Sequence, residues 1–92
     1  MTPEGRVESH LKTQCDKKGI LCYKFQSPSN SGVPDRVLVA NGKVVFLELK
    51  RPGETPRKLQ QHVIKRLKKA GATVYVADNN DDVDAILKEL LS

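Results

Sequence analysis

Asp35 and Glu48 are the two residues whose types and spacing are best suited to joint chemistry. They lie on either side of Asn41-Gly42, a dipeptide that favours a two-residue hairpin turn because both of its positions tolerate φ > 0. Counting pairs outward from that turn places Asp35 directly across from Glu48. Opposed residues in an antiparallel pair have Cβ atoms roughly 4.5–5.5 Å apart.

Two carboxylates at that separation repel each other, so the arrangement is unfavourable without a partner. A divalent cation between them removes the conflict, and hard oxygen ligands suit Mg²⁺ or Mn²⁺. Lys50 lies two residues beyond Glu48, so its side chain leaves the same face of the strand. A metal ion held by two carboxylates beside an ammonium is suited to phosphodiester hydrolysis.

The elements that must position these residues form an α/β domain. Turn and capping residues together with apolar periodicity predict helices over 2–18, 55–70 and 83–91, strands over 20–25 and 73–77, and a hairpin over 34–50. We therefore expect a mixed four-stranded sheet flanked by helices, with a further helix at the C-terminal end. Both faces of the hairpin are apolar through the middle, which predicts a sheet covered on both sides.

The aromatic residues all fall within predicted strands. We expect them in the core, which argues against an exposed base-stacking platform. The four are Tyr23, Phe25, Phe46 and Tyr75.

Pro34-Asp35, twelve intervening residues and Glu48-Leu49-Lys50 resemble the signature of the PD-(D/E)XK nuclease superfamily. With Glu8 on the first helix, Gly32-Val33 before the acid and Gln60 on the second helix, the pattern is similar to the VRR-NUC branch. The resemblance runs from about Glu4 to Ala77. It implies a restriction-endonuclease-like αβββαβ core, with the predicted last helix as an addition.

The family implies roles for the central residues. Asp35 and Glu48 would bind the metal, with the backbone carbonyl of Leu49 as a third ligand. Lys50 would orient or help to deprotonate the attacking water and stabilise negative charge. The products implied by the family carry a 5′-phosphate.

Glu8 and Gln60 have less direct roles in this resemblance. Glu8 would reach the metal through water or help to hold a second ion. Gln60 would position water or Lys50, although neighbouring Gln61 competes for that role. Stand-alone viral and bacterial members of the family are homodimers that act on branched DNA such as Holliday junctions, which implies the same assembly and substrate here.

The charge of the chain points to a polyanionic partner. The net charge is +5, divided into +9 over residues 1–77 and −4 over residues 78–92, and phosphate contacts supply most non-specific affinity for nucleic acid. The polar loop after the first strand and cations near the acids are the predicted DNA contacts, namely Lys24, Ser27, Ser29, Asn30, Ser31, Arg36, Arg51, Arg57 and Lys58. The basic run Lys65 to Lys69 is either a further phosphate contact or a solvated helix face.

The remaining features narrow the function by exclusion. The 92 residues predict a single domain, 1–92. The chain has no glycine-rich phosphate loop after a strand, so we expect no nucleotide cofactor. No apolar run approaches the length of a membrane span, and Cys15 and Cys22 read as buried, reduced thiols. We therefore expect a cytoplasmic protein, in the host cytoplasm if viral.

Two other functions remain open from the sequence. One is a nuclease-like domain that binds nucleic acid without cleaving it. The other is a small α/β binding or regulatory domain with no role on nucleic acid. The first predicts intact binding without catalysis, and the second predicts that Glu48→Ala changes stability alone.

Overall fold

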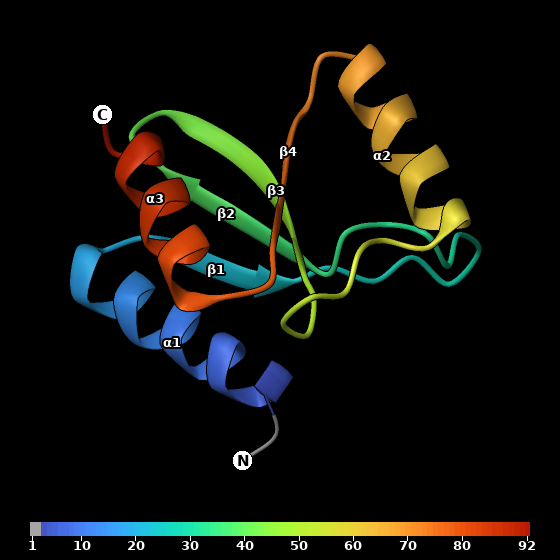
Figure 1. The fold of residues 1–92 in the computed structure, drawn as a ribbon. Coiled ribbons are helices and arrows are strands. Elements are labelled where there is room, and N and C mark those ends of the chain that lie inside the picture. Colours follow the sequence, from blue (N-terminus) through green and yellow to red (C-terminus); the bar gives the residue numbers. More distant parts are fainter. Residues whose placement is uncertain (1–2) are drawn as a thin grey trace.

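The structure, a computed structural model that describes residues 3–92, has the predicted order of elements (Figure 1). In chain order these are α1 (Pro3–Lys18), β1 (Leu21–Lys24), β2 (Arg36–Ala40), β3 (Lys43–Leu49), α2 (Lys58–Lys69), β4 (Thr73–Ala77) and α3 (Asn80–Leu90). The strands form one sheet in the order β1-β2-β3-β4. The first three are antiparallel, and β4 runs parallel to β3. The αβββαβ core with an added C-terminal helix is confirmed.

The hairpin that carries the acids has the predicted turn and register. Asn41 and Gly42 have φ values of 55° and 72°, as a turn with two positive φ angles requires. The register pairs Val37 with Phe46, which is the pairing obtained by counting outward from the turn. This register fixes which side chains share a face of the sheet.

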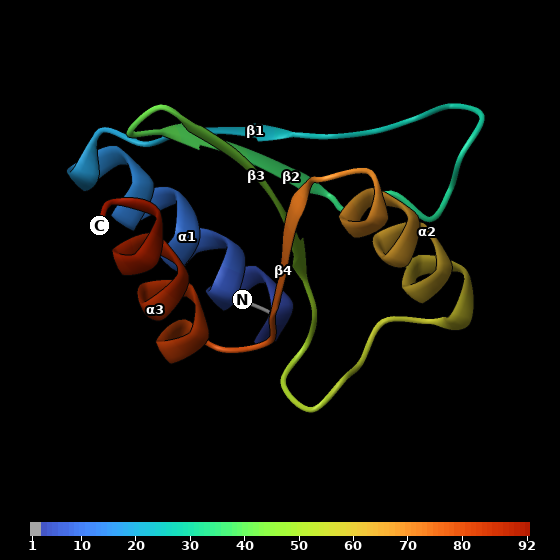
Figure 2. The same ribbon diagram turned by 90° about the horizontal axis from the view of Figure 1, so that it is seen from above.

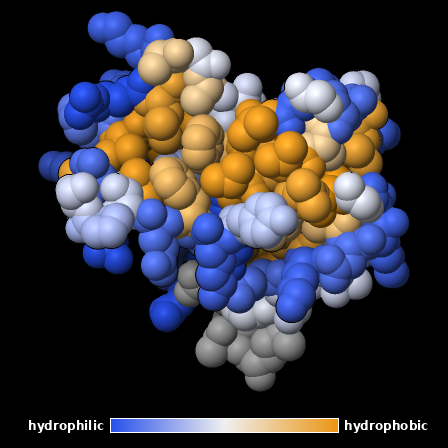
Figure 3. All heavy atoms as spheres, turned by 180° about the vertical axis from the view of Figure 1, so that it is seen from behind, coloured by the Kyte–Doolittle hydropathy of each residue, from blue (hydrophilic) through white to orange (hydrophobic). Residues whose placement is uncertain are grey.

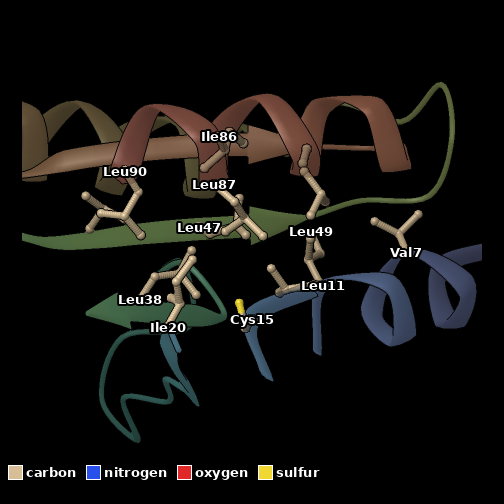
Figure 4. Packing of buried hydrophobic residues seen from close by; sticks show 13 residues of the cluster. Val7, Leu11, Cys15, Ile20, Leu38, Leu47, Leu49, Ile86, Leu87 and Leu90 are labelled. Atoms are coloured by element: carbon tan, nitrogen blue, oxygen red, sulfur yellow. The ribbon is translucent and has the colours of Figure 1, made fainter. Parts of the chain in front are cut away.

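The core lies between the sheet and the pair α1 and α3, which cover one face (Figure 2). Figure 4 shows side chains from both helices meeting those of the strands. The buried cluster comprises Val7, Leu11, Cys15, Ile20, Leu38, Val45, Leu47, Leu49, Ala77, Val83, Ile86, Leu87 and Leu90. Cys15 is buried as expected and Cys22 is half-buried.

The opposite face of the sheet is largely open, so the prediction of a sheet covered on both sides was wrong. Helix α2 lies on that side next to β4 and leaves β1 to β3 uncovered (Figure 2). The prediction that the aromatic residues lie in the core was also wrong for three of the four. Tyr23 is 62% exposed because its outward face meets no helix, and Phe25 and Phe46 are half-buried against each other outside the buried cluster. Tyr75 packs against that cluster, partly buried. The exposed and half-buried apolar side chains on this face of β1 to β3 form what we call the outer apolar patch (Figure 3). They are Leu21, Tyr23, Val37, Val39, Val44 and Phe46.

Helix α2 begins later than predicted. It starts at Lys58 with Arg57 as its N-cap, not at Thr55-Pro56. A residue that precedes proline is driven towards extended backbone, and the side chain of Gln60 supplies the cap by accepting the Arg57 amide at 3.1 Å. The predicted capping role of Thr2 on the first helix lies outside the described residues. No helix within residues 3–92 combines the length and apolar character that a membrane span requires.

Candidate active site

The two acids are held against each other where β2 begins and β3 ends. The backbone amide of Asp35 donates to Glu48 Oε1 at 3.2 Å. In return, Asp35 Oδ1 accepts the backbone amide of Leu49 at 3.0 Å. These reciprocal bonds bring Asp35 and Glu48 together, as the hairpin register predicts.

Glu48 is the most buried acid of this group. Its side chain is only 6% exposed, against 36% for that of Asp35. Lys50 Nζ lies 3.2 Å from Glu48 Oε2, so the ammonium sits beside the acids as predicted. Burial, followed by the negative charge of Asp35, raises the pKa of Glu48, and the contacts with Lys50 partly offset this rise. The pair is therefore an incompletely neutralised negative site.

Gln60 joins this group from α2. Its Nε2 donates to Glu48 Oε2 at 2.9 Å, while its Oε1 is occupied by the Arg57 amide at the helix start. Because the oxygen serves as the helix cap, the amide group is oriented with its NH₂ towards the acid. Gln61 instead donates to the carbonyl of Pro56. The structure thus brings Gln60, and not Gln61, to Glu48.

Glu8 approaches the acids through Arg36. Arg36 Nη2 lies 3.0 Å from Glu8 Oε2, and Nη1 lies 3.2 Å from Asp35 Oδ2 and 3.0 Å from the Asp35 carbonyl. The Arg36 side chain is 8% exposed, which suits a bridge between acids better than a surface contact to phosphate. Strand alternation explains this position, since Arg36 points to the opposite face from its neighbours, towards α1. That alternation was the sequence signal for the bridge.

The donor set fits a hard divalent cation. Asp35 and Glu48 supply carboxylate oxygens, which Mg²⁺ and Mn²⁺ prefer, and their mutual repulsion favours a cation between them. Within residues 3–92 no three His, Cys, Asp or Glu side chains cluster as a metal site. A cation held by these two acids would therefore take its other ligands from water, substrate oxygens or a backbone carbonyl; one or two carboxylates with water and phosphate oxygens are usual for Mg²⁺.

The other predicted DNA contacts lie around the site at the surface. Lys24 is exposed at the end of β1, Arg51 and Arg57 are exposed between β3 and α2, and Lys58 is exposed as the first residue of α2. In the loop after β1, Ser29, Asn30 and Ser31 are exposed and Ser27 is half-buried. Ser27, Asn30 and Ser31 help to line a hollow of about 460 Å³. These side chains are thus open to a ligand, in contrast to Arg36.

Gly32 ties the loop after β1 to α2, a contact that sequence reasoning missed. A Cβ at this position would lie 2.7 Å from Val63 Cγ2, 3.0 Å from the Leu59 carbonyl and 3.1 Å from Leu59 Cγ. Gly32 is buried there, so its lack of a side chain allows the loop to pack against the helix turn that carries Gln60. Only the tertiary packing reveals this requirement.

Gly32→Ala should therefore lower activity on nucleic acid by roughly 10–100-fold, because small displacements of positioning groups are costly. The added methyl group pushes α2 outward and weakens the contact between Gln60 and Glu48. Overpacking should also cost about 1–3 kcal/mol of stability. Cleavage rates and thermal denaturation measure the two effects.

Rescue by a second substitution separates positioning from simple instability. Val63→Ala removes the atom nearest to the new methyl group, so Gly32→Ala/Val63→Ala should recover part of the lost rate. Val63→Ala alone serves as the control. Wild-type activity in Gly32→Ala would show that this contact does not position Gln60.

Known proteins are similar to this chain in sequence and in fold. The sequence is 46% identical over 81 residues to "Putative nuclease p44" of Acyrthosiphon pisum secondary endosymbiont phage 1, covering 85% of each chain. A solved structure described as "VRR_NUC domain" superposes with a TM-score of 0.87 at 30% identity, covering 96% of this chain and 97% of that chain. No family model matches the sequence. From the identity to the phage relative and the closeness of the solved structure, the chain belongs to the VRR-NUC family of nucleases.

Proposed function

We propose that the protein is a metal-dependent, structure-specific DNA endonuclease that hydrolyses phosphodiester bonds in branched DNA, as a homodimer and with Mg²⁺ or Mn²⁺. The observation that carries this proposal is the contact of Asp35 with Glu48, in direct reach of Lys50 and Gln60. Two acids that would hold a metal ion, with an ammonium and an amide beside them, suit the hydrolysis of a phosphate ester, which requires charge stabilisation and a positioned water. The alternative is a domain of the same fold that binds nucleic acid without cleaving it.

The contacts of each residue indicate its proposed role in hydrolysis. Asp35 and Glu48 would hold the metal, with the Leu49 carbonyl, and the bound ion would supply Lewis-acid stabilisation of charge on the scissile phosphate. Lys50 is held by Glu48 at the edge of the site, where its ammonium can hydrogen-bond an attacking water and stabilise negative charge.

Gln60, Arg36 and Glu8 act through other residues. Gln60 fixes the orientation of the Glu48 carboxylate and can share a water with Lys50. Arg36 connects Glu8 to Asp35, so Glu8 positions Asp35 through the guanidinium. The side chain of Glu8 is 49% exposed, and Glu8 would hold a bound metal through water, as the family resemblance implies.

The homodimer would form through the outer apolar patch. This surface comes from three adjacent strands and contains no charged residue, while Tyr23 and Val44 are 62% and 59% exposed. Apolar patches of this kind mark interaction sites, and an apolar surface suits a second copy of itself across a two-fold axis. Two sites related by such an axis can cut both strands of a symmetric junction.

Tyr23→Glu, with Val44→Glu as a second variant, should convert the dimer into a monomer, because each would bury a charge at the interface. Sedimentation equilibrium measures the change. Leu91→Glu is the control, since Leu91 is 40% exposed but lies outside the patch. A wild-type protein that is monomeric both alone and on a junction would contradict the dimer.

The nuclease itself is tested with labelled four-way junction, splayed-arm, linear duplex and single-stranded DNA. Each is incubated with Mg²⁺, Mn²⁺ or EDTA, beside an Asp35→Ala variant. We expect metal-dependent paired nicks in the junction that the variant does not make. Binding without cleavage by the wild type, with either metal and on every substrate, would establish the alternative.

A further inference from the structure

Helix α2 carries an unusual charge for a surface helix. It contains five cations and no acid, and all five are exposed, namely Lys58, Lys65, Arg66, Lys68 and Lys69. Charged helix surfaces ordinarily mix both signs, which gives favourable pairs at i,i+4. A run of one sign without partners points to a ligand of the opposite sign.

None of these cations has a carboxylate partner within residues 3–92. Lys58 also lies in the first turn, where the helix dipole disfavours a cation. The other helices follow the dipole, since α3 has Asp81 and Asp82 in its first turn and α1 has Lys17 and Lys18 in its last. The C-terminal end of α2 also follows the dipole, since Arg66, Lys68 and Lys69 lie in its last turn. Helix stability alone therefore accounts for these three cations, but not for Lys58, for Lys65 or for the lack of acids on the helix.

Three of the lysines lie in one line along the helix. Lys58, His62, Lys65 and Lys69 follow one another at spacings of four, three and four residues, which places them on one face. From Lys58 to Lys69 the helix rises about 16 Å, the length of roughly five base pairs of duplex. We call this face the outer lysine line.

The outer lysine line faces away from the catalytic residues. Gln60 and the buried Ile64 lie on the opposite face of α2, which contacts the sheet. Figures 1 and 2 show α2 at one edge of the molecule, separated from α1 and the acidic α3. A strand at Glu48 and a ligand on the lysine line would thus lie on two sides of one helix.

We propose that the outer lysine line binds the phosphate backbone of a second DNA duplex segment, separate from the strand at Glu48. This proposal rests on the proposed nuclease function and deepens it by giving the protein two DNA contacts. The spacing and sign of the charges suit backbone phosphates, which carry no sequence information and position the duplex. A branched substrate supplies two segments that diverge, whereas a short linear duplex supplies one.

The test is a triple variant, Lys58→Gln/Lys65→Gln/Lys69→Gln. Fluorescence anisotropy measures its affinity for a four-way junction and for a linear duplex across a series of salt concentrations. Each lost phosphate contact should reduce the slope of log K against log salt by about 0.9, and the loss of affinity should be larger for the junction. Because Lys58 is also one of the predicted DNA contacts around the site, single-turnover cleavage of bound DNA is measured on Lys65→Gln/Lys69→Gln, where it should be unchanged. The Tm of the triple variant should stay level or rise because like charges have been removed.

Two further variants make the result specific. Lys17→Gln/Lys18→Gln/Lys88→Gln removes the same charge from α1 and α3, and should change the salt slope less. Lys58→Arg/Lys65→Arg/Lys69→Arg keeps the charge and should bind as the wild type does. Two results would overturn the proposal that the outer lysine line binds DNA. One is an unchanged salt dependence of binding in the Lys→Gln variant of α2, and the other is an equal loss of affinity in the α1 and α3 control.

The experiments distinguish a failure of the lysine-line proposal from a failure of the proposed nuclease function. A wild type that binds junctions through these lysines but never cleaves them would refute the enzyme and leave the lysine line in place. A wild type that cleaves junctions, with a triple variant of unchanged salt slope, would refute the lysine line alone.

Discussion

Lys50→Met should lower the cleavage rate by about 10²–10⁴-fold while the affinity for DNA stays close to that of the wild type. Lys50 is 10% exposed on its side chain and lies 3.2 Å from Glu48 Oε2, so the substitution removes the ammonium at the acids and little of the charged surface. Methionine retains most of the side-chain volume. Single-turnover cleavage with protein in excess measures the rate, and anisotropy measures the affinity.

Lys43→Met is the matched control, because Lys43 begins β3 whereas Lys50 directly follows the other end of that strand. Lys43 Nζ donates to the Ser92 carbonyl at 3.1 Å, away from the acids. That variant should cleave normally. Lys50→Arg should not rescue the loss, since a planar guanidinium does not replace a compact ammonium in a confined site. Normal cleavage by Lys50→Met would remove Lys50 from the mechanism, and loss of binding would make it a binding residue.

At 100 times its Kd, Mg²⁺ or Mn²⁺ should raise the thermal midpoint of the metal-free protein by roughly 10–20 °C, with a larger shift at pH 8 than at pH 5. A cation at 100 times its Kd adds about 2.7 kcal/mol, and each kcal/mol moves Tm by roughly 4–8 °C in a domain of this size. Differential scanning fluorimetry with and without EDTA makes the measurement.

The pH dependence follows from Glu48. Burial and the charge of Asp35 raise its pKa above the ordinary 4.5, so in this pH range the folded state binds more protons than the unfolded state. The stability contributed by Glu48 is therefore full below pH 4.5 and is lost as the pH rises through the elevated folded pKa. A cation restores it by neutralising the charged acids, which is why its effect grows with pH.

Asp35→Asn should abolish this metal-induced shift together with cleavage. Asp81→Asn is the control, because Asp81 is exposed in the first turn of α3 and should leave both unchanged. A shift of equal size at both pH values, or one that persists in Asp35→Asn, would show that the cation binds elsewhere.

The hairpin and its acids could be predicted from sequence because local rules determine them. Asn41-Gly42 fixes the turn, and the two-residue period of the strands fixes which residues share a face. The register of Val37 with Phe46 then followed without knowledge of any other element. The same two-residue period of the strand predicted that the side chain of Lys50 lies on the face of Glu48.

The features that the sequence did not reveal depend on contacts between distant elements. Tyr23 lies in an apolar strand, and only the position of the helices decides that its face is open. Gly32 is required by side chains of α2 that lie about thirty residues later. The start of α2 depends on Gln60, whose amide serves the helix cap and Glu48 at once.

The site residues lie at different distances from one another along the chain. These distances determine the order in which the site can assemble during folding. Asp35 and Glu48 belong to one short hairpin, and local contacts of this kind form within microseconds. Gln60 arrives only when α2 docks, and β4 must add in parallel across that helix, which is a slower, non-local step. The repulsive pair is thus created early in folding, before its amide partner is present, so a cation bound at that stage would speed folding as well as slow unfolding.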